Sequence, residues 1–139
     1  MNLNSYFIGF SVATLLIVYI FKVPQRITRA DTLVKEYYYD NAVQSFFLDL
    51  VLIFAYLRVA SFGANLLNLN TLVSKTVATI VTTILLSSAF MAFFLTQPAG
   101  SSFFATWFRK AGFRAVTYDA VIVSSVFLLS KTVNRFICK

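Results

Sequence analysis

Two aspartates in apolar surroundings are the residues of this chain best placed to do chemistry. Asp49 and Asp119 each lie in a long stretch of hydrophobic side chains. A carboxylate in hydrocarbon costs about 2.5–3.5 kcal/mol by membrane-insertion scales, so each one needs a partner or a path to water. One chemistry that uses such an acid is proton-coupled transport, in which a carboxylate releases its proton as the substrate binds.

The positions of the two acids favour a structural role instead. Asp49 lies about two helical turns inside its apolar stretch, and Asp119 about one turn inside the last stretch. Arg109, Lys110 and Arg114 precede the last stretch, on the membrane side where both stretches begin. We therefore expect Asp49 and Asp119 to form interfacial ion pairs with these basic side chains. Small four-helix exporters carry their essential acid in the middle of the first span, whereas the first apolar stretch here has no acid.

The residue types that enzymes and metal sites need are scarce. The chain has no histidine and a single cysteine, Cys138, which excludes a Cys/His zinc site, a histidine base and an intrachain disulfide. No nucleophile stands beside a base, and there is no Gly-rich phosphate loop. We expect neither an enzyme nor a cofactor-binding protein. Cys138 is either a plain surface thiol or a site of reversible acylation.

The composition identifies the elements that must position the two acids. Hydrophobic residues make up 59% of the 139 residues and charged residues 12%, against about 45–50% and about 25% in soluble domains. A bilayer crossing needs on the order of 20 apolar residues. The sequence predicts an all-α integral membrane protein, a single membrane domain over residues 1–139, with transmembrane helices at about 6–21, 42–62, 76–95 and 115–130.

Local signals predict where these helices end. Pro24 is expected to stop the first helix, and Gly63 the second. The last helix extends toward Ile137 if Lys131 and Arg135 reach the membrane surface. The first stretch reads as an uncleaved anchor rather than a signal peptide, because its positive charges follow the apolar run.

The segment 101–114 has the pattern of a helix that lies in the membrane surface. One helical face carries the apolar side chains Phe103, Phe104, Trp107, Phe108 and Ala111, and basic residues flank it. Ser101 or Ser102 is expected to cap this helix, and Gly112 to separate it from the last span. Tyr37, Tyr38 and Tyr39 likewise suit an interfacial belt better than a ligand cage.

Small residues recur at four-residue spacing in three of the spans, one of these lines being Ala120 and Ser124 in the fourth span. Ser5, Gly9 and Ala13 do so in the first span, and Thr79, Thr83 and Ser87 do so in the third. Such lines allow helices to approach closely within a membrane. They predict a compact bundle or helix faces used for oligomerisation.

The formal net charge is +7, and the positive residues lie mainly between the apolar stretches. This distribution favours anionic lipids or acidic protein partners over nucleic acid. The two longer connections carry seven of the twelve positive residues, which would place them in the cytoplasm. The candidate lipid or partner contacts are Arg26, Arg29, Lys35, Trp107, Arg109, Lys110 and Arg114.

The hydrophobic layout and the stretch FFATWFRKAGFRAVTYD, residues 103–119, resemble small multi-span proteins of large icosahedral DNA viruses with an internal membrane, such as the algal viruses. This resemblance is best over the last third of the chain. It implies a virion membrane component, with the segments 22–36 and 109–114 docking capsid proteins. We therefore expect a structural or scaffolding membrane protein of a large assembly. A small proton-coupled transporter or channel, and an accessory subunit of another membrane complex, are the alternatives.

Overall fold

The computed structural model describes residues 3–28, 31–98 and 103–137, and these residues form helices joined by short turns. The elements are α1 (Leu3–Thr14), the π-helical segment η1 (Leu15–Ile20), α2 (Val23–Thr28), α3 (Asp31–Val34), the π-helical segment η2 (Lys35–Asp40), α4 (Ala42–Leu66), α5 (Leu72–Leu95), α6 (Phe103–Ala111) and α7 (Phe113–Ile137). The prediction of an all-α fold is confirmed. Arg29, Ser101, Ser102 and Cys138 lie outside the described residues.

Within the described ranges, four helices are long and apolar enough to cross a membrane. They are Leu3–Ile20, Ala42–Leu66, Leu72–Leu95 and Phe113–Phe136, with mean hydropathies of 1.8, 1.8, 2.1 and 1.4. Large apolar side chains on α4 and α5 are exposed at four-residue spacing, among them Val43, Phe47 and Val51, then Val73, Val77 and Val81. Rows of exposed apolar side chains along a helix are typical of surfaces that contact lipid or a protein partner.

Two helix ends differ from the prediction. α4 continues past Gly63 to Leu66, and the chain reverses at Asn68, whose φ is 55°. Asparagine tolerates this left-handed conformation better than most residues, so no glycine is required there. The first helix ends before Pro24, because Lys22 has a φ of 52°. Pro24 instead lies in the first turn of α2, where its missing N–H leaves no hydrogen bond unmade.

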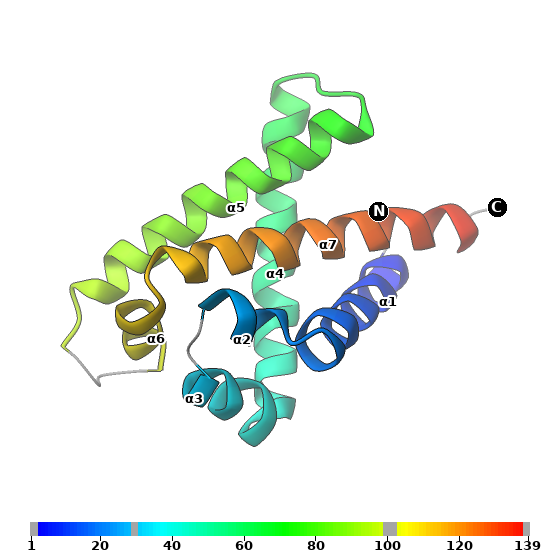
Figure 1. The fold of residues 1–139 in the computed structure, drawn as a ribbon. Coiled ribbons are helices and arrows are strands. Elements are labelled where there is room, and N and C mark those ends of the chain that lie inside the picture. Colours follow the sequence, from blue (N-terminus) through cyan, green and yellow to red (C-terminus); the bar gives the residue numbers. More distant parts are fainter. Residues whose placement is uncertain (1–2, 29–30, 99–102, 138–139) are drawn as a thin grey trace.

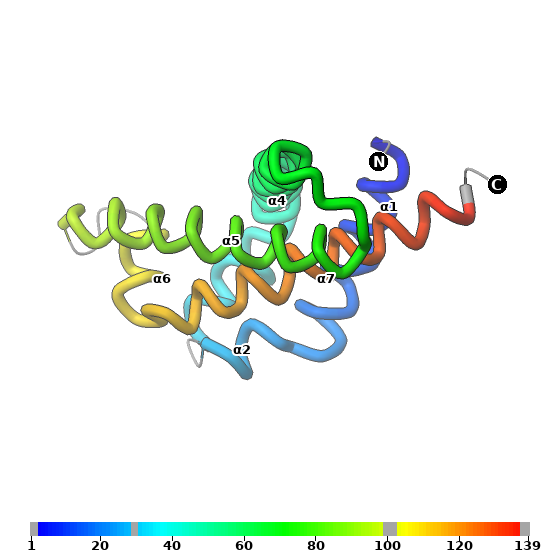
Figure 2. The backbone as a smooth tube through the Cα atoms, turned by 90° about the horizontal axis from the view of Figure 1, so that it is seen from above, coloured from blue at the N-terminus to red at the C-terminus, as the bar shows by residue number. Residues whose placement is uncertain are grey.

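The helices are arranged around α7 (Figure 1). α7 packs against α1 and against α5, and α4 packs on α5. Seen from above, α4 is viewed nearly along its axis while α5 and α7 run across the view, so α4 crosses them steeply (Figure 2). α2, α3 and α6 gather at one end of the molecule, and the α4–α5 connection lies at the other (Figure 1). This arrangement matches the prediction that the two longer connections share one side.

The small-residue lines lie at helix contacts. Ser5, Gly9 and Ala13 are buried in α1, and Thr79, Thr83 and Ser87 are buried in α5. A Cβ added to Gly9 would lie 2.7 Å from the backbone nitrogen of Ser130, so only glycine fits between α1 and α7 at this point. The contact at Gly9 agrees with the expectation of a compact bundle, whereas oligomerisation through such faces stays a prediction.

Candidate functional site: an acid–aromatic cavity

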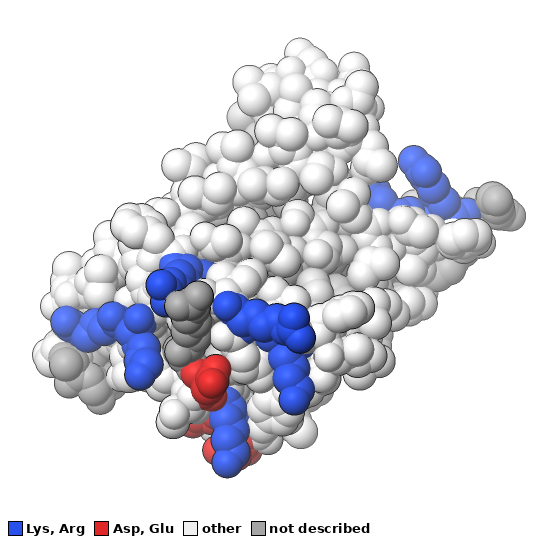
Figure 3. Space-filling model, in the orientation of Figure 1, with Lys and Arg blue, Asp and Glu red and all other residues white. Residues whose placement is uncertain are grey.

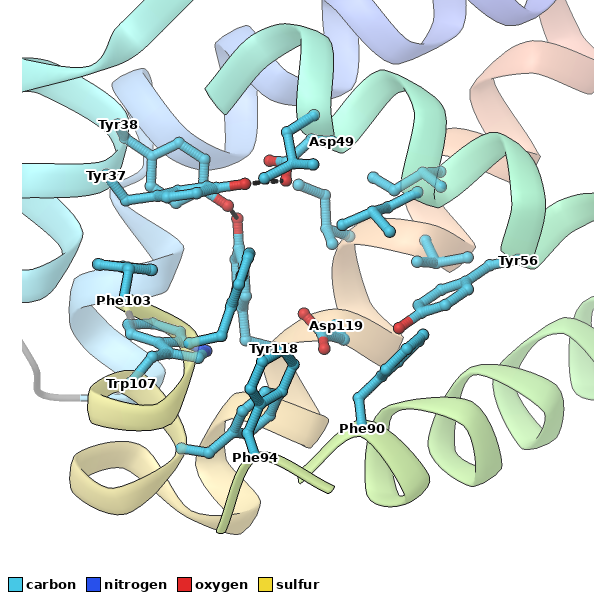
Figure 4. A pocket seen from close by; sticks show the side chains of 17 residues that line it. Tyr37, Tyr38, Asp49, Tyr56, Phe90, Phe94, Phe103, Trp107, Tyr118 and Asp119 are labelled. Atoms are coloured by element: carbon cyan, nitrogen blue, oxygen red, sulfur yellow. Dashed lines mark hydrogen bonds between the residues drawn. The ribbon is translucent and has the colours of Figure 1, made fainter. Parts of the chain in front are cut away.

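A cavity of about 190 Å³ lies where η2, α4, α5, α6 and α7 meet. We call it the acid–aromatic cavity, because two carboxylates and ten aromatic side chains line it together with a few aliphatic residues (Figure 4). Its lining residues are Tyr37, Tyr38, Leu48, Asp49, Leu52, Ile53, Tyr56, Phe90, Phe94, Phe103, Phe104, Trp107, Phe108, Tyr118, Asp119, Ile122 and Val123. The two acids singled out in the sequence therefore face one space.

The turn between η2 and α4 brings Tyr37 to Asp49. At Asn41, with φ −118° and ψ 42°, the chain changes direction, and the Asn41 side chain donates a 2.9 Å hydrogen bond to the carbonyl oxygen of Glu36. η2 consequently folds back beside the first turns of α4. The Tyr37 hydroxyl then donates a 2.6 Å hydrogen bond to a carboxylate oxygen of Asp49, twelve residues further along the chain.

Tyr37 and Tyr38 of η2 are held in the protonated form. Burial, followed by the negative field of Asp49, raises the pKa of Tyr37 far above its ordinary value. The same two causes, in the same order, raise the pKa of Tyr38. The Tyr38 hydroxyl lies 2.8 Å from the hydroxyl of Tyr118 on α7. The phenols at this end of the cavity are thus neutral hydrogen-bonding groups.

Asp119 has a different hydroxyl partner. Ser87, fully buried in α5, donates a 2.8 Å hydrogen bond to a carboxylate oxygen of Asp119 on α7. The Tyr56 hydroxyl lies 3.5 Å from the Ser87 oxygen. Both aspartates are only half-buried, and Figure 4 shows their carboxylates turned toward the cavity space.

The expected ion pairs are replaced by these hydroxyl contacts. Among the described residues, the hydrogen-bond partners of Asp49 and Asp119 are hydroxyl groups rather than cations. Arg109 instead donates hydrogen bonds of 3.2 and 2.5 Å to the carbonyl oxygens of Leu95 and Gln97. Lys110 and Arg114 are exposed. The physical reason is the orientation of α6, whose aromatic face points inward and whose basic residues therefore point outward.

α6 forms as predicted, but the protein covers its apolar face. Trp107 is 7% exposed and Phe108 is 5% exposed. The Phe103 ring stacks on Tyr37 with centroids 5.0 Å apart, and the Trp107 ring stacks on Phe103 at 6.1 Å. Trp107 was expected to contact lipid or a partner, and it lines the cavity instead. Gly112, with a φ of 60°, separates α6 from α7 as predicted.

The tyrosine cluster also differs from the expected interfacial belt. Tyr37 is half-buried and Tyr38 is buried, both lining the cavity, whereas Tyr39 is 41% exposed. Consecutive residues on a helix point in different directions, so Tyr37 and Tyr38 line the cavity while Tyr39 lies on the surface. Of the three side chains, only Tyr39 is exposed as an interfacial belt would require.

The remaining basic candidates gather at one end. Arg26, Lys35, Lys110 and Arg114 are exposed at the end where α2, α3 and α6 lie. Figure 3 shows basic side chains there with acidic ones among them, and a separate basic group near the end of α7. This surface and the acid–aromatic cavity lie in the same half of the molecule.

No group of three His, Cys, Asp or Glu side chains within residues 3–28, 31–98 and 103–137 could hold a metal ion. The chemistry open to the cavity is therefore that of two carboxylates, phenols and aromatic faces. No protein-family model, curated protein or solved structure matches this chain.

Proposed function

We propose that this chain is a multi-pass membrane protein that binds a small hydrophobic organic cation in the acid–aromatic cavity and exchanges it for protons. The observation that carries the proposal is the surroundings of Asp49 and Asp119. Each is half-buried, each has a hydroxyl as its hydrogen-bond partner, and both line the same aromatic space. Four helices long and apolar enough to cross a membrane support the multi-pass placement.

The lining selects a cation. A carboxylate in low-dielectric surroundings attracts positive charge far more strongly than one in water. Aromatic faces attract cations within about 6 Å of the ring centroid, and quaternary ammonium groups suit such aromatic cages well. The aliphatic side chains of Leu52, Ile53 and Ile122 complete the wall. A ligand with a positive head and an aromatic or aliphatic body satisfies all three kinds of surface.

The size of the cavity limits the ligand. Its volume of about 190 Å³ is below the range of roughly 300–1,000 Å³ that is typical of drug-sized sites. We therefore expect a ligand as small as phenyltrimethylammonium. This cation has a fixed charge, one ring and no proton to lose, which makes it a suitable probe.

Proton exchange is supported by the partners of the two carboxylates, which among the described residues are hydroxyl groups rather than basic side chains. An empty site can neutralise a desolvated carboxylate by protonation. A bound cation favours the ionised form, so binding expels a proton and protonation expels the cation. Tyr37 and Ser87 assist because each donates a hydrogen bond to the ionised carboxylate. A carrier that alternates between these two occupants moves cations against protons.

The test is binding of phenyltrimethylammonium to the purified full chain in detergent, measured by calorimetry in a weak buffer that reports proton release. The wild type is expected to bind and to release protons. Asp49→Asn/Asp119→Asn is expected to lose at least tenfold in affinity, because two opposite charges about 4 Å apart attract each other by about 4 kcal/mol in surroundings like these. The matched control is Asp31→Asn/Asp40→Asn, which removes the same charge from exposed positions.

Three results separate the parts of the proposal. Equal binding by the double cavity variant would overturn the cavity as the site. Equal binding of tert-butylbenzene, the uncharged isostere, would overturn cation recognition. Binding without proton release would overturn exchange, and uptake into liposomes driven by a pH gradient then tests transport directly.

A second candidate function is favoured by the exposed basic end. Lys22, Arg26, Lys35, Lys110 and Arg114 are exposed in and around α2, α3 and α6. Such a surface suits an acidic protein face, as in a scaffold of a large assembly, a virion membrane component beneath a capsid, or an accessory subunit. Extraction in mild detergent with identification of co-purifying proteins tests this. Arg26→Glu/Lys110→Glu is expected to release the partner, and a wild type that runs alone as a small oligomer would remove this candidate.

A further inference from the structure

A second cavity, of about 120 Å³, lies near the opposite end of the molecule, between α1, α4, α5 and α7. We call it the basic cavity, because Arg58, Lys75 and Lys131 line it. Ser61 and Asn65 add polar groups to the same wall. The remaining lining residues are Leu3, Tyr6, Phe54, Leu57, Ala60, Ala64, Thr79 and Phe127.

No acidic side chain balances these cations. The five acids of the chain are Asp31, Glu36, Asp40, Asp49 and Asp119, and none of them lines the basic cavity. Lys75 and Lys131 are half-buried, and their ammonium groups repel each other. Bringing like charges together in partly desolvated surroundings is unfavourable unless an anion joins them.

Aromatic rings hold two of the cations in place. The Arg58 guanidinium lies 4.9 Å from the centroid of the Phe54 ring, and the Lys131 ammonium lies 5.7 Å from that of Phe127. Cation–π contacts of this kind fix the position of a charge without neutralising it. Arg58 and Lys131 are thus positioned for an anion, and Lys75 lines the same cavity.

Their depth in the spans identifies the source of the anion. Lys75 is three residues inside the start of α5, Lys131 is six residues from the end of α7, and Arg58 is eight residues from the end of α4. At about 1.5 Å of rise per residue, these charges lie roughly 5–12 Å inside the helix ends. Charged side chains this close to span ends reach the level of the lipid phosphates.

The apolar part of the lining agrees with this source. Leu3, which is 65% exposed, and the half-buried Phe54 leave apolar surface uncovered in the wall of the same cavity. A free phosphate ion would gain nothing from these surfaces, whereas a lipid acyl chain would cover them. Basic pockets between transmembrane helices are a known way to hold anionic headgroups.

We propose that the basic cavity binds the phosphate headgroup of an anionic phospholipid through Arg58, Lys75 and Lys131. The lipid replaces the missing counter-charge and joins α4, α5 and α7 at this end of the bundle. The site is separate from the acid–aromatic cavity, because the two share no lining residue. It therefore does not depend on the cation-binding proposal.

The test uses the full chain, purified in detergent and stripped of lipid. Thermal unfolding is followed while phosphatidylglycerol or phosphatidylcholine with identical acyl chains is added. Phosphatidylglycerol is expected to bind at least about tenfold more tightly, since each nearby basic residue contributes about 1 kcal/mol toward an anionic headgroup. Equal binding of the two lipids would overturn the proposal.

Variants locate the site. Lys75→Gln/Lys131→Gln is expected to bind phosphatidylglycerol no better than phosphatidylcholine, whereas the control Lys22→Gln/Lys35→Gln keeps the preference. Relief of the lysine repulsion is expected to make the first variant at least as stable as the wild type without lipid, so loss of binding cannot be attributed to misfolding. Lys75→Arg/Lys131→Arg, which keeps both charges, is expected to retain the preference. A preference retained in Lys75→Gln/Lys131→Gln would place the lipid elsewhere.

An inorganic phosphate arm distinguishes the lipid from the free ion. Phosphate at the same concentration is expected to give no shift in the unfolding temperature, because it lacks the acyl chains that cover the apolar wall. A shift equal to that of phosphatidylglycerol would overturn the lipid as the occupant.

Discussion

The Tyr37 hydroxyl donates a 2.6 Å hydrogen bond to Asp49, across the turn that joins η2 to α4. This bond attaches a segment outside the four apolar helices to one of them. It also supplies the ionised carboxylate with a donor that stays protonated, because burial and then Asp49 raise the pKa of Tyr37. The bond therefore contributes both to the fold and to the stabilisation of the ionised carboxylate, which the proposed cation binding requires.

Tyr37→Phe removes this donor and leaves the carboxylate poorly satisfied. We expect a loss of about 1–3 kcal/mol in the free energy of unfolding, as for other buried polar groups that lose a partner. Denaturant titration of the purified protein in micelles measures the loss. Tyr39→Phe, at the exposed neighbour, is the control and should be close to neutral. Similar losses in both variants would contradict the role of the hydrogen bond.

Gly9→Ala tests the contact between α1 and α7. The added Cβ would lie 2.7 Å from the nitrogen and 2.8 Å from the Cα of Ser130, which are backbone atoms that cannot rotate away. We expect a destabilisation of at least about 1–3 kcal/mol, as in other overpacked interiors. Gly63→Ala is the matched control, because its Cβ meets nothing within 4 Å. The helical preference of alanine should make that variant neutral or slightly more stable.

The chain has a single tryptophan, Trp107, and its fluorescence reports the position of α6. Trp107 is 7% exposed and is surrounded by aromatic side chains. Its fluorescence should therefore have a short emission maximum and should resist quenching by aqueous iodide. Phenyltrimethylammonium should change its emission, because Trp107 lines the acid–aromatic cavity. An α6 that lies on the membrane surface would instead give emission that iodide quenches readily.

Arg109→Ala should lower the free energy of unfolding more than Lys110→Ala at the neighbouring position. Arg109 donates to the carbonyl oxygens of Leu95 and Gln97, where α5 ends. Its loss removes both hydrogen bonds and a favourable charge at a helix C-terminus, which costs about 0.5–1 kcal/mol. Lys110→Ala should change the unfolding free energy by less. An equal effect in thermal unfolding would show that the contacts at the end of α5 contribute nothing.

Much of the fold follows from apolar stretches and small residues alone. The four long helices, the separate α6 and the turn at Gly112 are all predictable, because hydrophobic length and a glycine with positive φ act locally. The buried lines through Gly9 and Thr83 follow as well, because small side chains are what close helix packing needs. The end of α4 was less predictable. Gly63 can remain within a helix, and Asn68 can adopt the left-handed conformation at which the chain turns.

The cavity was not predictable, because it depends on contacts between distant segments. Asp119 meets Ser87 across 32 positions of the chain, and Tyr38 meets Tyr118 across 80. Basic residues stand close to both acids in the sequence, which led to the expectation of ion pairs. The amphipathic pattern of α6 fixes which residues share a face, but not whether lipid or protein covers that face. At Trp107, on this face, the covering surface is protein rather than lipid.

The pairing of α1 with α7 has a consequence for how the chain is made. Ser5 donates a 3.1 Å hydrogen bond to Asn134, so the two helices are joined by residues 129 positions apart. During translation α1 emerges long before α7 exists, and its buried face, with the gap at Gly9, has no partner in the nascent chain. That face stays without this partner until α7 has been synthesised. A ribosome stalled before α7 is made would thus leave α1 open to contact with other helices, and synthesis of α7 is the step that covers its packing face.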